Sequence, residues 1–207
     1  MTTAHPRRFI LILGGVRSGK SDLAQKLALD IGGRDVLFLA TAAASDAEMV
    51  QRITAHQQGR PAGWRTVEEQ LHVADAIAAG EQRAKAVLLD CVTLWVANIL
   101  GATSPDGGAT PDAGAAEAML AEEIGALADW YRGSRASVVI VSNEVGMGLV
   151  PPYPSGRVYR DLLGLANQEL ARRATEVYLT VAGIPVDLKQ LMARPWQHSR
   201  DEPHPAD

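Results

Sequence analysis

The chain has 207 residues, of which 47% are hydrophobic, and carries a formal net charge of −4 without a basic run. This length and apolar content predict one sizeable core in a single domain spanning 1–207, and the acidic balance argues against nucleic acid as a partner. The one cysteine, Cys91, excludes an internal disulfide framework and a multi-cysteine zinc site. No apolar run is long enough to span a bilayer, so we expect a soluble cytoplasmic protein with no membrane partner.

The first predicted element is an apolar strand at 9–13, which leads into Gly14–Ser21 and then an amphipathic helix from Asp22. Gly, four residues and Gly-Lys-Ser between a strand and a helix are typical of a phosphate-binding loop. Its backbone N–H groups and the helix dipole would bind phosphate, Lys20 would reach the terminal phosphates, and the Ser21 hydroxyl would hold Mg²⁺. A glycine-rich turn with a chance Lys-Ser is disfavoured by the flanking strand and helix.

Strands and helices are predicted to alternate along the rest of the chain. Apolar runs predict strands at 36–40, 64–67, 86–89, 137–141 and 176–181. Helices are predicted from the capping box at Ser45 to the Gln58–Pro61 stop, and at 71–79, 93–100, 115–132 and 159–174. We interpret 101–114 as a mobile linker, and 1–8 and 194–207 as flexible tails. The pattern predicts an α/β fold with a mostly parallel sheet and helices on both faces.

Polar residues follow several of these strands, and in a parallel sheet such residues gather at the edge where ligands bind. Asp90 has the place of a Walker-B acid, which would hold the Mg²⁺ shell or a nucleotide hydroxyl, although a solvated carboxylate also fits. The Asn143–Gly148 loop would line the cleft or merely connect a strand to a helix. Glu68 and Glu69 would meet the nucleotide or be surface acids, and Cys91 fits a small buried residue better than a nucleophile.

Among the histidines, His56 has the most suggestive neighbours, because Arg52 and Arg60 lie one turn away on either side. A neutral imidazole can attack phosphorus, and the arginines would favour a nearby polyphosphate. An exposed helix histidine is the alternative, and His72 is similar on these grounds. The residues alone leave this choice open.

An ordered set of motifs resembles one family across 9–189. The motifs are Gly14–Ser21, Leu39–Ala42, Glu48–Met49, Arg52–Ile53, His56, Gly59–Pro61, Trp64–Thr66, Leu88–Cys91, Val141–Gly148, Arg160–Asp161, Asn167–Gln168 and Val181–Pro185. They resemble the bifunctional adenosylcobinamide kinase/adenosylcobinamide-phosphate guanylyltransferase family of cobalamin biosynthesis. Some members carry a second histidine where this chain has Ala55, so the match to His56 is less ambiguous here.

The resemblance implies a RecA-like P-loop domain, a homotrimer and two activities. The first phosphorylates the aminopropanol hydroxyl of adenosylcobinamide with ATP or GTP, and the second transfers GMP from GTP to that phosphate through a guanylylated histidine, with Mg²⁺. It assigns catalysis to His56 and Lys20 and a metal to Ser21 and Asp90. The implied nucleotide contacts are Gly14, Gly15, Val16, Arg17, Ser18, Gly19, Lys20, Ser21, Ala40, Thr41, Ala42, Gln57, Gln58, Gly59, Arg60, Glu68 and Asp90.

Two other functions would use the same phosphate loop and Asp90 but leave His56 without a role. One is a nucleotide-binding regulatory or assembly ATPase, and the other is a plain small-molecule kinase. Covalent labelling by GTP that carries ³²P at its α-phosphate distinguishes them, because only a guanylyltransferase with a protein nucleophile retains that phosphorus.

Overall fold

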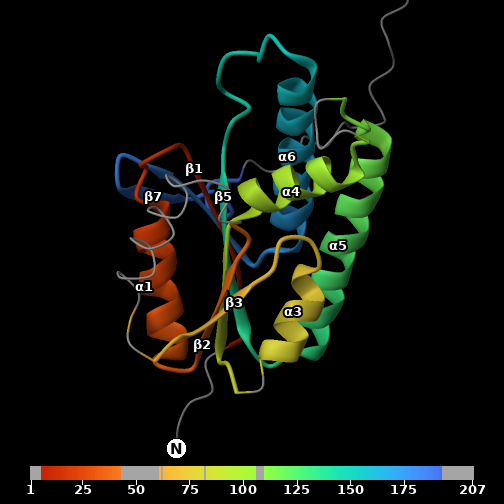
Figure 1. Cartoon of the computed structure of the whole chain (residues 1–207). Helices are drawn as coiled ribbons and strands as arrows, with labels where there is room; N and C mark the ends of the chain where they lie inside the picture. The colour runs from red at the N-terminus through yellow and green to blue at the C-terminus, as the bar shows by residue number, and fades with distance from the viewer. Residues whose placement is uncertain (1–5, 43–60, 62, 82, 106–109, 193–207) are drawn as a thin grey trace, which may run out of the picture.

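The computed structural model describes residues 6–42, 61, 63–81, 83–105 and 110–192, and within these it forms one seven-stranded sheet flanked by helices (Figure 1). The strand order is β3-β2-β4-β5-β1-β6-β7, and each neighbouring pair is parallel except β6 and β7. The strands are β1 (Phe9–Gly14), β2 (Val36–Ala40), β3 (Arg65–Glu68), β4 (Ala86–Asp90), β5 (Ser137–Asn143), β6 (Glu176–Val181) and β7 (Ile184–Asp187). The helices are α1 (Lys20–Gly32), α3 (Val73–Gly80), α4 (Val92–Thr103), α5 (Ala113–Gly133) and α6 (Pro154–Arg173).

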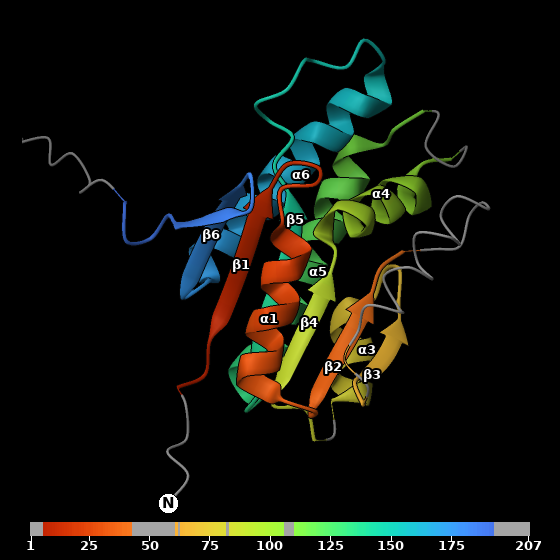
Figure 2. The same cartoon turned by 90° about the vertical axis from the view of Figure 1, so that its left-hand side faces the viewer.

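Helices cover both faces of the sheet, as Figures 1 and 2 show: α1 lies against one face, and α3, α4, α5 and α6 lie against the other. Alternation along the buried strands explains the two layers. In β1, Ile10 and Ile12 pack with α1, whereas Phe9 and Leu11 pack with the larger helical layer. The predicted α/β class, the mostly parallel sheet and the helices on both faces are confirmed, and β5 lies between the phosphate-loop strand and the Asp90 strand, as in RecA-like P-loop domains.

The expected linker at 101–114 is helical at both of its ends. Helix α4 continues to Thr103, whose hydroxyl donates to the Ile99 carbonyl, and the Ser104 hydroxyl donates to the Leu100 carbonyl. Helix α5 begins at Ala113, where the Asp112 carboxylate accepts a hydrogen bond from the Ala115 N–H. Side-chain bonds at helix termini, which composition does not reveal, therefore extend both helices into this stretch.

Two further differences from the sequence expectations concern the last third of the chain. Helix α6 begins at Pro154 rather than at 159, because proline has no N–H to lose in the first turn. Strand β7, which was not predicted, pairs with β6 through a two-residue turn in which Ala182 and Gly183 have φ of 51° and 81°. Two positive φ angles in succession are the signature of a tight hairpin turn.

The beginning of the chain is anchored where the structure describes it. Arg7 Nη1 donates to the Tyr131 carbonyl over 2.8 Å, and its guanidinium lies over the Tyr131 ring. Arg8 forms a bidentate ion pair with Glu176. Arg7 and Arg8 are therefore part of the fold rather than of a flexible tail, while residues 1–5 and 194–207 of the two expected tails lie outside the described residues.

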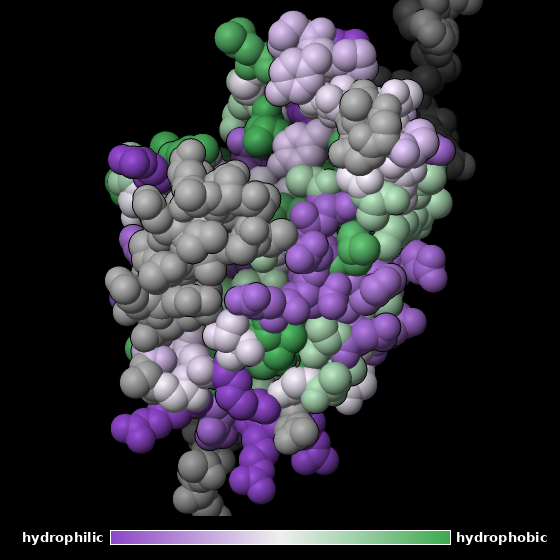
Figure 3. Space-filling view, in the orientation of Figure 1, coloured by the Kyte–Doolittle hydropathy of each residue, from purple (hydrophilic) through white to green (hydrophobic). Residues whose placement is uncertain are grey.

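The face shown in Figure 3 carries interspersed polar and apolar side chains over α3 and α5, rather than one broad apolar surface. Within the described ranges, none of the helices is both long enough and apolar enough to cross a bilayer. This agrees with the absence of long apolar runs in the sequence.

Candidate nucleotide-binding site

The phosphate loop connects β1 to α1 in the way the sequence predicts. Arg17 and Gly19 have positive φ angles of 56° and 92°, so the loop turns sharply just before α1 begins at Lys20. A Cβ atom on Gly14 would lie 2.5 Å from Ser18 Oγ and 2.6 Å from the Thr180 carbonyl oxygen. Only glycine fits at that position, because any side chain would push the loop away from the strand beside it.

The β6–β7 hairpin supports the phosphate loop from behind. The Gly183 N–H donates to the Ser18 carbonyl over 2.8 Å, and a Cβ on Gly19 would lie 3.1 Å from Gly183 Cα. The Val181–Pro185 motif therefore has a physical role here: its tight turn holds the loop through a backbone hydrogen bond. This contact depends on β7, which the sequence pattern did not predict.

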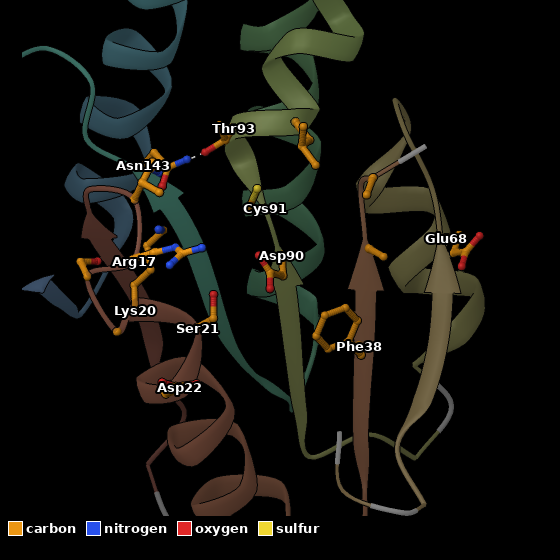
Figure 4. Close-up of a pocket in the computed structure, with 16 residues that line it drawn as sticks. Arg17, Lys20, Ser21, Asp22, Phe38, Glu68, Asp90, Cys91, Thr93 and Asn143 are labelled. Carbon is orange, nitrogen blue, oxygen red and sulfur yellow. Dashed lines mark hydrogen bonds between the residues drawn. The ribbon is translucent and has the colours of Figure 1, made fainter. Parts of the chain in front are cut away.

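A cavity of about 680 Å³ opens at the carboxyl-terminal edge of the sheet, beside the phosphate loop (Figure 4). Strands β2, β3, β4 and β5 and helices α1 and α4 all contribute to its wall. It is lined by Val16, Arg17, Ser18, Gly19, Lys20, Ser21, Asp22, Phe38, Ala40, Ala42, Glu68, Asp90, Cys91, Thr93, Leu94 and Asn143. The volume suits a small-molecule ligand, and Ala40, Asp90 and Asn143, which end their strands, meet at this edge.

Lys20 extends along the phosphate loop and donates from Nζ to the Gly15 carbonyl over 2.9 Å. Partial burial lowers the pKa of its ammonium group below the usual value, although the charge of the nearby Asp90 carboxylate acts in the opposite direction. A phosphate group beside Lys20 would offset that desolvation by placing a compensating anion against the ammonium.

Ser21 and Asp90 line the same cavity, one from the start of α1 and the other from the end of β4 (Figure 4). A hydroxyl and a carboxylate are hard oxygen donors of the kind that Mg²⁺ takes together with phosphate oxygens and water. Among the described residues, this cavity included, no group of three or more His, Cys, Asp or Glu side chains could hold a metal ion by itself. The donor set therefore fits a cation that arrives with a nucleotide.

Thr41, a predicted nucleotide contact, does not line the cavity. Its side chain is fully buried, and its hydroxyl donates to the Cys91 carbonyl over 2.7 Å and accepts from the Cys91 N–H over 2.9 Å. Asn98 on α4 donates to the carbonyls of Thr41 and Gln70. Thr41 therefore ties the end of β2 to β4, which supports the neighbouring wall residues Ala40 and Ala42.

Four wall residues were missed as site residues: Asp22, Phe38, Thr93 and Leu94. Phe38 precedes Ala40 by two positions on β2, so strand alternation alone could have placed both on one face. Thr93 and Leu94 enter the wall because α4 begins at Val92, one residue beyond the Cys91 that follows Asp90. Cys91 also lines the wall, but burial raises the pKa of its thiol to about 11, so the group is neutral near pH 7 and is no thiolate nucleophile.

Glu69 and His72 lie outside the cavity wall, where each makes hydrogen bonds of its own. Glu69 accepts hydrogen bonds from the N–H groups of Leu71 and His72, and these bonds hold the pKa of its carboxyl below the usual value. His72 pairs with Glu123 of α5 and does not line the cavity. His56 and Gln57–Arg60 lie outside the described residues, as does the expected helix that carries them.

A phosphate loop between a buried strand and a helix, with a strand-end acid across one cavity, defines a P-loop nucleotide-binding protein of the α/β class. The comparisons with known proteins specify the family. The sequence model described as "Cobinamide kinase / cobinamide phosphate guanyltransferase" matches residues 10–188. Because that match spans most of the chain, the protein belongs to this family and is an enzyme with kinase and guanyltransferase activities.

Named relatives agree with the family. The chain is 44% identical over 184 residues to the bifunctional adenosylcobalamin biosynthesis protein CobU of Escherichia coli, covering 87% of this chain and 99% of that protein. It is 42% identical over 179 residues to CobP of Pseudomonas aeruginosa, which carries the same description, covering 86% and 96%. Among solved structures, an ATPase domain is similar with a TM-score of 0.49 and 15% identity, covering 84% of this chain and 69% of that one.

Proposed function

We propose that the cavity binds ATP or GTP and that the enzyme acts on adenosylcobinamide in two steps. In the first, the aminopropanol hydroxyl is phosphorylated; in the second, GMP passes from GTP to the new phosphate, giving adenosylcobinamide-GDP and pyrophosphate. One observation carries the proposal: Lys20 and Ser21 of the phosphate loop and Asp90 of β4 line a single cavity at the edge where a parallel sheet binds ligands. The family and the named relatives support the choice of acceptor.

In the phosphoryl-transfer step, the phosphate loop would bind the β- and γ-phosphates through its N–H groups, with Lys20 beside the terminal phosphate. Mg²⁺ held by Ser21 and Asp90 would supply positive charge against the phosphate oxygens. Glu68, which lines the wall from β3, is proposed to meet the ribose or base. The remaining nucleotide contacts proposed are Gly14–Gly19, Ala40 and Ala42; Thr41 supports them from behind.

In the guanylyl-transfer step, we propose that neutral His56 attacks the α-phosphorus of GTP. The nitrogen–phosphorus bond forms as the bond to pyrophosphate breaks, and the phosphate loop neutralises the leaving group. An oxygen of adenosylcobinamide phosphate then attacks the same phosphorus and releases the histidine. Gln57, Gln58, Gly59 and Arg60, which adjoin His56 in the sequence, are proposed to contact this nucleotide.

Labelling with GTP that carries ³²P at the α-phosphate tests the covalent step. We expect wild-type protein to retain the label in an acid-labile, base-stable bond, and His56→Ala to lose both the label and adenosylcobinamide-GDP formation. His56→Ala should still phosphorylate adenosylcobinamide, because phosphoryl transfer needs no protein nucleophile. His72→Gln is the control, since glutamine keeps a donor for Glu123.

The outcomes separate the alternatives. If His56→Ala is still labelled and His72→Gln is not, His72 rather than His56 is the nucleophile. Acceptor phosphorylation by an unlabelled wild-type protein would indicate a plain kinase, and nucleotide hydrolysis without transfer would indicate a regulatory or assembly ATPase.

We also propose a homotrimer, as the family resemblance implies, and a location in the cytoplasm. Sedimentation equilibrium of the full chain should give three times the 22.1 kDa chain mass. A monomer at working concentration would contradict the trimer without affecting the chemistry.

A further inference from the structure

Asn143 occupies the central position of the sheet edge. It ends β5, the strand between the phosphate-loop strand β1 and the Asp90 strand β4. Its register partner on β1 is Gly14, where the phosphate loop begins. Asn143 lines the cavity, and Figure 4 shows it between the phosphate loop and the start of α4. It is therefore close to the terminal phosphate of any nucleotide that Lys20 binds.

The backbone of Asn143 is fixed from two sides. Its N–H donates to Thr93 Oγ1 over 3.0 Å, and its carbonyl accepts from Asn167 Nδ2 over 3.0 Å. Asn167 is itself held, because the buried Ser142 hydroxyl donates to its Oδ1 over 2.6 Å. Hydrogen bonds from two helices, α4 and α6, thus fix the direction from which this side chain enters the cavity. Such support is typical of groups that must be placed accurately.

The side chain of Asn143, in contrast, is not fully hydrogen-bonded. Its Oδ1 is shielded from solvent and has no hydrogen-bond partner. A buried polar atom without a partner is costly, and such an atom in a native structure calls for an explanation. Rotation about χ2, a broad torsion in asparagine, can bring the carboxamide oxygen to the cavity with the NH₂ group beside it. A ligand that supplies a donor at this point would satisfy the oxygen.

We propose, on the basis of the proposed phosphoryl-transfer function, that Asn143 is a catalytic residue of that step and that Thr93 and Asn167 are its positioning residues. The carboxamide oxygen accepts a hydrogen bond from the acceptor hydroxyl, and the NH₂ group donates to an oxygen of the γ-phosphate. The hydroxyl oxygen bonds to the γ-phosphorus as the bond to the nucleoside diphosphate breaks. An amide is no base near pH 7, so the hydroxyl proton passes to the transferred phosphoryl group and then to water.

A neutral carboxamide suits this position better than a carboxylate would. It orients a nucleophile without placing a negative charge against the triphosphate, which Asp90 already approaches from β4. An aspartate at 143 would repel the γ-phosphate and could not donate to it. Asn143→Asp should therefore be no more active in phosphorylation than Asn143→Ala.

The first test compares three readouts in Asn143→Ala: the kcat of adenosylcobinamide phosphorylation, the Kd for GTP, and α-³²P labelling. We expect kcat to fall about 100-fold, the usual cost of removing one donor to a transition-state oxygen, with the Kd and the labelling at wild-type levels. An unchanged kcat would overturn the proposal. So would equal losses of kcat and GTP affinity, because they would make Asn143 a ground-state binding residue.

The second test asks whether Thr93 acts by fixing the position of Asn143. Thr93→Val keeps the shape of the side chain but removes the acceptor of the Asn143 N–H, whereas Thr93→Ser keeps the hydroxyl. We expect Thr93→Val to lower the phosphorylation kcat without raising the Kd for GTP, and Thr93→Ser to restore it. Thr103→Val, at the other end of α4, is the matched control and should behave as wild type. Equal activity of Thr93→Val and Thr93→Ser would overturn the positioning role.

The two proposals fail in different ways. A wild-type protein that binds GTP but never phosphorylates adenosylcobinamide would refute the proposed function and the inference with it. A wild-type protein that phosphorylates the acceptor while Asn143→Ala does so equally well would refute only the role of Asn143.

Discussion

His72 Nδ1 lies 2.8 Å from Glu123 Oε1, which joins the residue before α3 to the middle of α5. The histidine side chain is 60% exposed, but the glutamate side chain is 11% exposed. The expectation of an ordinary exposed helix histidine is therefore incomplete, because His72 supplies the partner of a buried acid. Removing His72 by truncation would leave Glu123 without that partner, and a buried carboxylate without one is costly.

The His72–Glu123 pair predicts that the free energy of unfolding depends on pH. The hydrogen bond and the charge of Glu123 raise the pKa of His72 above the ordinary value of 6.5. The folded state therefore binds the proton more tightly than the unfolded state does. The stabilisation is fully present below the ordinary pKa and is lost as pH rises through the raised one.

Chemical denaturation of wild type and His72→Gln, from below pH 6.5 to above the raised pKa of His72, measures this contribution to the free energy of unfolding. We expect the stability advantage of the wild type to be largest at the acidic end and to shrink with rising pH. Solvent screening keeps the effect small, since the imidazole is mostly exposed. Parallel pH profiles of the two proteins would show that the pair contributes no linked proton.

Gly14 and Gly15 are neighbours in the phosphate loop, but replacing them with alanine should lower the free energy of unfolding by unequal amounts. A Cβ on Gly14 would lie 2.6 Å from the Thr180 carbonyl oxygen, whereas a Cβ on Gly15 would meet nothing within 4 Å. Overpacking against backbone cannot be relieved by a side-chain rotation, so Gly14→Ala should lower the free energy of unfolding by about 1–3 kcal/mol. Gly15→Ala should leave that free energy close to the wild-type value, as thermal denaturation can verify. Equal melting temperatures for the two variants would contradict the packing argument.

Much of this arrangement follows from sequence because parallel strands obey simple rules. A phosphate loop must sit between a strand and a helix, and residues that directly follow parallel strands must share an edge, so Ala40, Asp90 and Asn143 could be placed together. Thr41 shows the limit of this rule. It follows a strand, but the fold turns its hydroxyl toward the backbone of Cys91, a contact between residues 50 positions apart.

The remaining differences also arise from tertiary structure or from local rules that compete. Strand β7 is short and half exposed, and it is ordered by pairing with β6 and by the contact of Gly183 with the phosphate loop. Pro154 is a helix breaker inside a helix but a favoured residue in the first turn, and the sequence alone did not decide between these roles. The partner of His72 lies on α5, and no local pattern indicates that contact.

Lys20→Ala is expected to lower both activities by about 100-fold or more, with the fold intact. The substitution removes the positive charge beside the terminal phosphates and leaves the N–H groups of the loop in place. The loss should appear in phosphorylation and in α-³²P labelling alike, because both use the same bound triphosphate. Lys26→Ala, an exposed lysine on the same helix, is the control. Wild-type turnover of GTP by folded Lys20→Ala would refute the role of the lysine.

The last prediction concerns Asn98, whose Nδ2 donates to the Thr41 carbonyl over 2.8 Å and to the Gln70 carbonyl over 3.2 Å. These bonds fix where the chain leaves β2 toward the segment that contains His56. Asn98→Asp removes both donors and places a carboxylate against two carbonyl oxygens, so it should cost about 1–3 kcal/mol of stability. We expect the rate of α-³²P labelling to fall more than the rate of phosphorylation, because the hydrogen bonds of Asn98 go to the Thr41 and Gln70 carbonyls rather than to the phosphate loop or Asn143. Asn98→Ala, which removes the donors without adding charge, should show the same order of effects with a smaller loss of stability. A phosphorylation rate that falls as far as the labelling rate in both variants would mean that Asn98 supports the whole sheet edge rather than the path to His56.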